Sequence, residues 1–316
     1  MKKISEKIVF FGNERLATGV TTEAPTLQAL IDAGYPVAAV VSNYEPAQSR
    51  SARVLEIEAV AKSHNIPVLL PARPKDIKDQ LQNYQAALGV LVAYGKIVPQ
   101  EIIDIFPHGI VNIHPSLLPL YRGPTPIEQA ILDGVSTTGV SIMQLSKEMD
   151  AGPVFAQTQM NLTGNESKQE LADELLRLGG ELLINQLPKI LDGSATPTTQ
   201  NDTKATYDTL ITKANGNIDW HKPALQIERE IRAFLEWPKS RTQLAGKEVI
   251  ITKARELRSE ESGVRSEEKP GTAYVSDDKR LFVTTGEGTL IIDRLKPAGK
   301  NEMPAQAFLA GHRHLL

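Results

Sequence analysis

Short apolar runs alternate with longer amphipathic stretches over the first 113 residues. The amphipathic stretches predict helices and the apolar runs predict buried strands. The helices are expected up to residue 32 and over 53–64, 74–82 and 99–105, and the strands over 8–11, 37–41, 68–70, 87–92 and 109–113. Strands separated by helices favour right-handed crossovers and a mostly parallel sheet that is covered on both faces. The pattern therefore predicts a doubly wound, Rossmann-like α/β domain.

The pattern changes after the first half of the chain. Ser167, with Glu170 three residues later, predicts the start of a helix over 167–183. Residues 192–209 are rich in Thr, Gly, Asp and Pro and carry few large apolar side chains, which is typical of a linker. A helix over 223–234 and four short strands over 249–253, 271–275, 281–284 and 290–295 predict a small OB-like β-barrel. We expect a first domain over 1–191, a linker over 192–209 and a second domain over 210–316.

Composition narrows the chemistry further. With 41% hydrophobic and 23% charged residues, the chain has the composition of an ordinary globular protein. It contains no cysteine, which excludes disulfides, a thiolate nucleophile and cysteine-ligated zinc. The longest uncharged apolar run, near 86–95, falls well short of the roughly 20 residues that span a bilayer. We expect a cytoplasmic protein with no membrane contact and no metal.

Charge is divided unevenly along the chain. Residues 1–202 carry a net charge of −6 and residues 203–316 a net charge of +3, for a total of −3. A basic second part is suited to a polyanion, since each phosphate contact needs a cation. The imbalance is small enough to arise from ordinary surface scatter as well.

The most informative polar residues are expected just after strands, because ligands of such sheets bind beyond the carboxyl ends of the strands. Asn112 and His114 are two apart at a strand end, so their side chains should point the same way. An amide donor beside an imidazole suits acyl transfer, in which the amide stabilises an oxyanion and the imidazole moves protons. Bonding of both side chains to the loop backbone is the alternative. Neither GxGxxG nor GxxxxGK[ST] occurs, so a nucleotide-phosphate loop has no support.

The segment after this strand carries a specific resemblance. The sequence NIHPSLLPLYRGPTPIEQAI over 112–131 resembles the signature of the 10-formyltetrahydrofolate-dependent formyltransferases. VLVAYGKIVPQEI before it and TGVSIMQLSKEMDAGPV after it are also similar to that family. The resemblance implies transfer of a formyl group from 10-formyltetrahydrofolate to a primary amine through a tetrahedral intermediate. It identifies Asn112, His114 and Asp150 as the catalytic group.

The family also suggests a role for each residue. Asn112 would donate to the oxyanion, His114 would act as general acid/base or oxyanion partner, and Asp150 would orient the imidazole and help to deprotonate the amine. By position, the resemblance implies a folate pocket formed by Tyr94, Gly95, Ser116, Leu117, Leu118, Pro119 and Met143, with Arg122 beside it. No metal ion is implied.

The resemblance continues into the second half of the chain. GNIDWHKPALQIEREIRAF and LFVTTGEGTLIIDRLKPAGKNEMPAQAFLAG are similar to the C-terminal domain of methionyl-tRNA formyltransferases. This implies initiator methionyl-tRNA as the acceptor and a tRNA-binding role for the second domain. By position, the residues expected to contact tRNA phosphates are Arg50 and Arg53 of the first domain and Lys213, Arg232 and Lys247 of the second. We expect the protein to be a monomer.

Three other functions remain open at this point. They are formylation of an amino sugar nucleotide, folate or RNA binding without catalysis, and hydrolysis of formyltetrahydrofolate. The chain also departs from the family pattern at GNERLATG over 12–19, at Pro115, and in the segment over 43–53, where the only basic residues are Arg50 and Arg53. These departures affect the expected acceptor substrate more than the expected formyl-transfer reaction.

Overall fold

The computed structural model describes residues 5–43, 55–257, 268–276 and 278–312. The chain forms two compact units. The first unit comprises Met1–Ile127, Ser136–Leu162 and Gln169–Thr209, and the second comprises Glu128–Val135, Thr163–Lys168 and Leu210–Leu316. Arg50 and Arg53, both expected to contact tRNA, lie outside the described residues.

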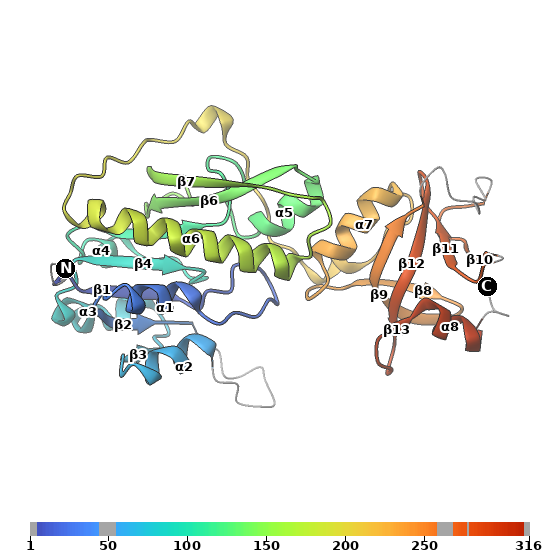
Figure 1. Cartoon of the computed structure of the whole chain (residues 1–316), viewed down its shortest axis with the longest axis horizontal. Coiled ribbons are helices and arrows are strands. Elements are labelled where there is room, and N and C mark those ends of the chain that lie inside the picture. Colours follow the sequence, from blue (N-terminus) through green and yellow to red (C-terminus); the bar gives the residue numbers. More distant parts are fainter. Residues whose placement is uncertain (1–4, 44–54, 258–267, 277, 313–316) are drawn as a thin grey trace. The chain divides into compact units, whose positions relative to one another are not determined.

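A seven-stranded sheet forms the centre of the first unit (Figure 1). Its order is β3-β2-β1-β4-β5-β6-β7. The first five strands of this order are parallel, and β6 pairs antiparallel with both β5 and β7. The doubly wound, mostly parallel sheet is thus confirmed, with an antiparallel edge. The strands are β1 (Ile8–Gly12), β2 (Val37–Val41), β3 (Val68–Leu69), β4 (Leu88–Val92), β5 (Ile110–His114), β6 (Thr137–Gln144) and β7 (Val154–Asn161).

Helices cover both faces of this sheet, which is why β1 and β4 are apolar throughout and β5 is apolar except for Asn112 and His114. On one face, Val9 and Phe11 of β1 belong to a buried cluster with Leu81 of α3 and Ile102 of α4. On the other, Gly179 of α6 lies directly over β5. The helices are α1 (Pro25–Asp32), α2 (Glu56–Ser63), α3 (Lys78–Tyr84), α4 (Gln100–Ile103), α5 (Pro126–Asp133) and α6 (Lys168–Leu191), and a 3₁₀ helix, η2 (Pro74–Ile77), precedes α3.

The segment over 12–19 turns the chain from β1 toward α1. Gly12 has a φ of +130°, and a Cβ atom there would lie 1.8 Å from the main-chain oxygen of Val92. The two carboxylate oxygens of Glu14 each accept a bond of 2.8 Å, from the main-chain N–H groups of Thr26 and Leu27. These are free N–H groups of the first turn of α1, so Glu14 caps that helix from 12 residues away.

The second unit contains an antiparallel sheet of six strands, consistent with the OB-like domain that we expected. Five strands run in the order β10-β11-β12-β9-β8, and β13 pairs with β12. Ile227 and Ile231 of α7 and Phe308 of α8 pack with the inner strand residues into one buried cluster. The elements are η4 (Lys213–Gly216), α7 (Ala224–Ala233), β8 (Ser240–Leu244), β9 (Lys247–Glu256), β10 (Ala273–Val275), β11 (Leu281–Thr284), β12 (Thr289–Pro297), β13 (Met303–Pro304) and α8 (Ala305–His312).

Several elements differ from the sequence expectation. α6 continues to Leu191, eight residues beyond the expected end, and it includes Pro188 in its last turn. The segment over 192–209 is part of the first unit and contains a 3₁₀ helix, η3 (Asp202–Lys204).

Among the described residues, no helix combines the length and apolar character needed to cross a bilayer.

Candidate active site

Strand β5 carries two of the three expected catalytic residues. Asn112 pairs with Met143 of β6 and His114 pairs with Ser141, so the two side chains share one face of the sheet. Both are buried, at 7% and 4% exposure. Among the described residues, the Asn112 side chain makes no hydrogen bond. Its amide is therefore available as a donor, and the alternative in which it bonds the loop backbone is not what the structure shows.

The tautomer of His114 follows from its partners. Its Nε2 atom lies 2.8 Å from the main-chain oxygen of Tyr121. A carbonyl oxygen can only accept a hydrogen bond, so Nε2 carries the proton. In the neutral ring, Nδ1 then holds the free lone pair, and this atom faces Oδ1 of Asp150 at 3.8 Å. The ring is thereby oriented to take up a proton at Nδ1, beside a carboxylate that stabilises the resulting cation.

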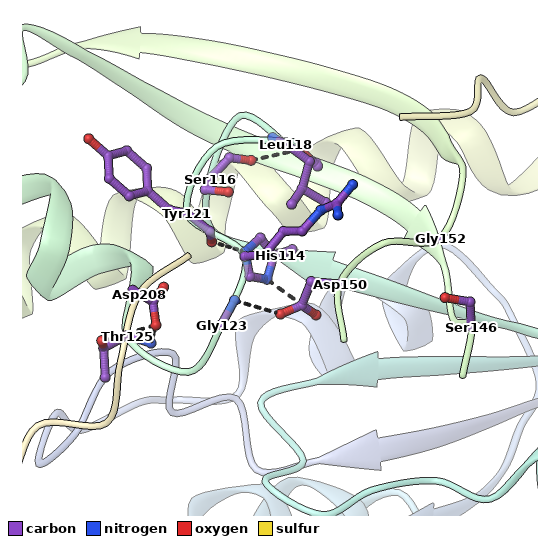
Figure 2. Close-up of polar contacts among 12 residues, drawn as sticks. His114, Ser116, Leu118, Tyr121, Gly123, Thr125, Ser146, Asp150, Gly152 and Asp208 are labelled. Carbon is purple, nitrogen blue, oxygen red and sulfur yellow. Dashed lines mark hydrogen bonds and ion pairs between the residues drawn. The ribbon is translucent and has the colours of Figure 1, made fainter. Parts of the chain in front are cut away.

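Asp150 reaches the site from the connection between β6 and β7 (Figure 2). Its φ is +50°, a left-handed conformation that Asp tolerates better than most residues. The main-chain N–H of Gly123 donates to its Oδ2 at 2.9 Å. Asp150, which the family resemblance implied, therefore lies within reach of His114, and its carboxylate is held by the loop that follows β5.

That loop is fixed by side chains of the antiparallel edge. The hydroxyl of Ser141 donates to the main-chain oxygen of Ser116 at 2.6 Å and accepts from the N–H of Leu118 at 3.1 Å. Gln157 of β7 donates to the main-chain oxygen of Leu118 at 2.8 Å. Ser116 donates to the main-chain oxygen of Leu120. A segment with few regular backbone partners is thus held in one conformation.

The residues expected to bind folate fall into two groups. Ser116, Leu118 and Met143 are buried beside the catalytic strand, and Leu117 and Pro119 are half-buried in the same loop. Tyr94 follows the end of β4 by two residues and is buried, with its ring edge-on to that of Phe11. Gly95, the next residue, is exposed. The Tyr94 hydroxyl has no hydrogen-bond partner among the described residues, and burial raises its pKa to about 12.

Arg122 faces inward and is 2% exposed. Its guanidinium donates to Gln200 at 3.0 Å, to the Tyr207 hydroxyl at 2.9 Å and to Asp202 at 2.7 Å. All three partners belong to the segment over 192–209. In this structure, the Arg122 side chain therefore binds the segment over 192–209.

The basic residues of the second unit differ in how they are engaged. Lys213 and Lys247 are exposed, and neither forms an ion pair with a described residue. Arg232 is bound by both carboxylate oxygens of Glu228, at 2.6 and 2.9 Å, and donates to the main-chain oxygen of Glu166 at 3.0 Å. Its guanidinium thus already has several acceptors.

Two residues near the catalytic group were not expected from the sequence, Asp208 and Gln200. Oδ1 of Asp208 accepts from the N–H of Thr125 at 2.8 Å, and its Oδ2 has no partner among the described residues (Figure 2). Burial raises the pKa of Asp208, while the bonds from Thr125 oppose that rise. Gln200 donates to the main-chain oxygens of Asp150 and Gly152. Both lie in a polar segment in which no spacing pattern distinguishes them.

The sequence as a whole matches known proteins over nearly its full length. Residues 7–187 match the formyl transferase family, and residues 210–313 match the formyl transferase C-terminal domain. A protein from Chloroflexus aurantiacus named methionyl-tRNA formyltransferase is 37% identical over 310 residues, which is 96% of each chain. The chain belongs to the formyl transferase family. A formyl transferase function therefore explains why an amide, an imidazole and a carboxylate meet in this fold.

Solved structures share the fold at lower identity. An N-formyltransferase from Helicobacter canadensis, in complex with folinic acid and dTDP-3-aminofucose, has a TM-score of 0.67 and 18% identity, covering 92% of this formyl transferase and 98% of that chain. HypX from Aquifex aeolicus, in complex with tetrahydrofolic acid, has a TM-score of 0.63 and 19% identity over 96% of this chain. This formyl transferase spans about half the length of the HypX chain, at 47%.

Proposed function

We propose that this formyl transferase moves the formyl group of 10-formyltetrahydrofolate to the amino group of initiator methionyl-tRNA. The observation that carries the proposal is the meeting of Asn112, His114 and Asp150 at the end of β5, with a free amide and a free imidazole lone pair. The C-terminal match over 210–313 and the name of the Chloroflexus aurantiacus relative support methionyl-tRNA as the acceptor.

The chemistry assigns one step to each side chain. The acceptor amine attacks the formyl carbon, and the carbonyl oxygen becomes an oxyanion to which the Asn112 amide donates. The proton released by the amine passes to Nδ1 of His114, and the Asp150 carboxylate stabilises the imidazolium. When the bond to the folate nitrogen breaks, the imidazolium returns the proton to that nitrogen. Atoms and charges balance without a metal or a redox group.

The remaining assignments form part of the same proposal. Tyr94, Gly95, Ser116, Leu117, Leu118, Pro119 and Met143 would line the folate pocket, and Lys213, Arg232 and Lys247 would meet tRNA phosphates. We place the catalytic domain at 1–191 and the tRNA-binding domain at 210–316, and the segment over 192–209, which we expected as a linker, packs with the catalytic unit. The protein would act as a monomer in the cytoplasm.

A direct assay tests the acceptor. The protein is incubated with 10-formyltetrahydrofolate and either methionyl-tRNA or an amino sugar nucleotide, and the formylated product is measured by mass spectrometry. Formylmethionyl-tRNA is the expected product. Formylation of the sugar nucleotide alone would establish the second acceptor class, and release of free formate without either acceptor would identify a hydrolase.

A further inference from the structure

The segment over 198–208, which we call the brace, is bound along its length to the elements of the catalytic group. Thr198 exchanges two main-chain bonds of 2.8 Å with Val154 at the start of β7. Thr206 accepts from the main-chain N–H of Arg122 at 2.9 Å and donates its own N–H to Pro119 at 3.2 Å. A polar segment that looks like a linker in sequence is therefore part of the catalytic unit.

The brace reaches Asp150 through Gln200. The side-chain amide nitrogen of Gln200 donates to the main-chain oxygen of Asp150 at 2.8 Å and to that of Gly152 at 2.7 Å. These two bonds hold the turn on both sides of Ala151. Since Asp150 is in a left-handed conformation, its backbone needs such support to stay in place.

Gln200 is in turn held by Arg122. The Nε atom of Arg122 donates to Oε1 of Gln200 at 3.0 Å, which fixes the amide so that its nitrogen points toward Asp150. The buried guanidinium is also bound by Tyr207 and Asp202 of the brace. Arg122 thus orients the Gln200 amide through its oxygen, and the amide nitrogen donates to the main-chain oxygen of Asp150.

A second contact from the brace approaches Asp150 on its carboxylate side. Oδ1 of Asp208 is bonded to Thr125 and lies 2.5 Å from the position that a Cβ atom on Gly123 would take. The N–H of Gly123 is the donor to Oδ2 of Asp150. The brace thus binds the backbone carbonyl of Asp150 through Gln200, and Asp208 lies against Gly123, whose N–H binds the Asp150 carboxylate.

We propose that Gln200 is a positioning residue for Asp150, and that Arg122 orients Gln200 for this task. The inference rests on the proposed function, in which Asp150 stabilises the protonated His114. Gln200 touches neither the imidazole nor the reacting carbon, so it acts through Asp150. Displacement of a catalytic group by about 1 Å can lower the rate about 100-fold.

Formyl transfer to methionyl-tRNA, measured in single turnovers over a range of concentrations of each substrate up to saturation, tests this role. Gln200→Met keeps the length of the side chain and removes its hydrogen bonds, and we expect it to lower the rate constant about 10- to 100-fold with little change in KM for either substrate. Gln159→Met, at an exposed glutamine of β7, is the matched control and should keep the wild-type rate. A rate for Gln200→Met equal to that of the control would overturn the inference while leaving the proposed function intact.

Two further variants separate positioning from general structural support. Gln200→Glu retains an acceptor for Arg122 but has no donor for Asp150, so it should be as slow as Gln200→Met. In an Asp150→Asn background, Gln200→Met should cause little further loss, because its effect passes through the missing carboxylate. A wild-type rate for Gln200→Glu, or losses that multiply in the double variant, would overturn the role. Absence of transfer by the wild-type protein would overturn the proposed function, and this inference with it.

Discussion

His114 and Asp150 face each other with 3.8 Å between Nδ1 and Oδ1, a distance too long for a hydrogen bond and short enough for an ion pair. Because Nε2 of His114 is committed to Tyr121, Nδ1 is the ring nitrogen that can gain or lose a proton during turnover. The carboxylate becomes most useful when this nitrogen is protonated. The pair is therefore suited to stabilising a charge that exists only during the reaction.

Substitution of Asp150 tests this. Asp150→Asn keeps the shape and an acceptor for the Gly123 N–H but removes the negative charge. We expect the turnover number to fall by about 10²- to 10⁴-fold, the range of acid–base contributions, with an unchanged melting temperature. Steady-state formyl transfer and thermal melting are compared with those of Asp79→Asn, at an exposed position of α3. Turnover within a few-fold of wild type would remove Asp150 from the mechanism.

Asn112 is expected to act on the oxyanion. Asn112→Ala should lower the turnover number by about 10²- to 10³-fold, as loss of one oxyanion donor does elsewhere, while KM for the folate changes little. The measurement is a full kinetic series for both substrates. Asn185→Ala, on the exposed surface of α6, serves as the control. An increase in KM alone would show that Asn112 binds substrate rather than the transition state.

The fold was predictable where burial leaves a continuous signal. β1, β4 and β5 are buried at every residue, so β1 and β4 are apolar runs and β5 is apolar apart from Asn112 and His114. β7 was missed because its residues alternate between half-buried and exposed and include several polar side chains. α5 was missed because its first residue is Pro126, at the end of a proline-rich loop.

The candidate site was predictable only in part. Asn112 and His114 follow from their spacing at a strand end, whereas Asp150 required the family resemblance, because nothing local links it to His114. Gln200 and Asp208 form hydrogen bonds with Asp150 and Thr125, which are distant from them in the sequence. Both lie in a segment whose Thr- and Asp-rich composition is also typical of a linker. Long-range hydrogen bonds of this kind leave no periodic pattern in the sequence.

A buried lysine in the second unit is expected to matter for stability. Lys168 is fully buried, with its Nζ 3.8 Å from the buried Glu128, 3.4 Å from Glu236 and 3.2 Å from the main-chain oxygen of Trp237. Burial lowers the pKa of Lys168, and the two carboxylates oppose that effect. Lys168→Met should lower the free energy of unfolding by about 3–5 kcal/mol, since it removes the cation that faces the buried carboxyl group of Glu128.

Urea unfolding measures this loss. Adding Glu128→Met to Lys168→Met should recover most of the stability, because removal of both charges is far less costly than removal of one. Lys62→Met, in an exposed i,i+4 pair with Glu58, provides the comparison and should have a much smaller effect. Equal losses for Lys168→Met and Lys62→Met would contradict the buried-charge argument.

The exposed lysines of the second unit are expected to contact tRNA phosphates. Lys213→Ala and Lys247→Ala should each weaken tRNA binding and reduce the slope of log K against log salt by roughly 0.7–0.9, the value for one phosphate contact. Binding is measured by filter retention or fluorescence over a salt series. Lys189→Ala, at an exposed position of α6, should leave the slope unchanged. An unaltered slope in either variant would show that the residue lies off the tRNA path.

Glu14 makes the stability of the first unit depend on pH. Burial raises its pKa from 4.5 to about 7, and this outweighs the two N–H bonds that favour the charged form. Because the folded pKa exceeds the unfolded one, its contribution is fully present below pH 4.5 and is lost as the pH rises to about 7. Over this range the free energy of unfolding falls by about 1.4 kcal/mol per pH unit, which gives a total loss of about 3 kcal/mol.

Urea unfolding at pH 5, 6, 7 and 8 tests this prediction. The free energy of unfolding should decline more steeply with pH for the wild type than for Glu14→Gln, which cannot ionise. Glu23→Gln, at an exposed carboxyl of the same loop, should retain the wild-type decline, and parallel curves for wild type and Glu14→Gln would show that Glu14 is ionised throughout this range.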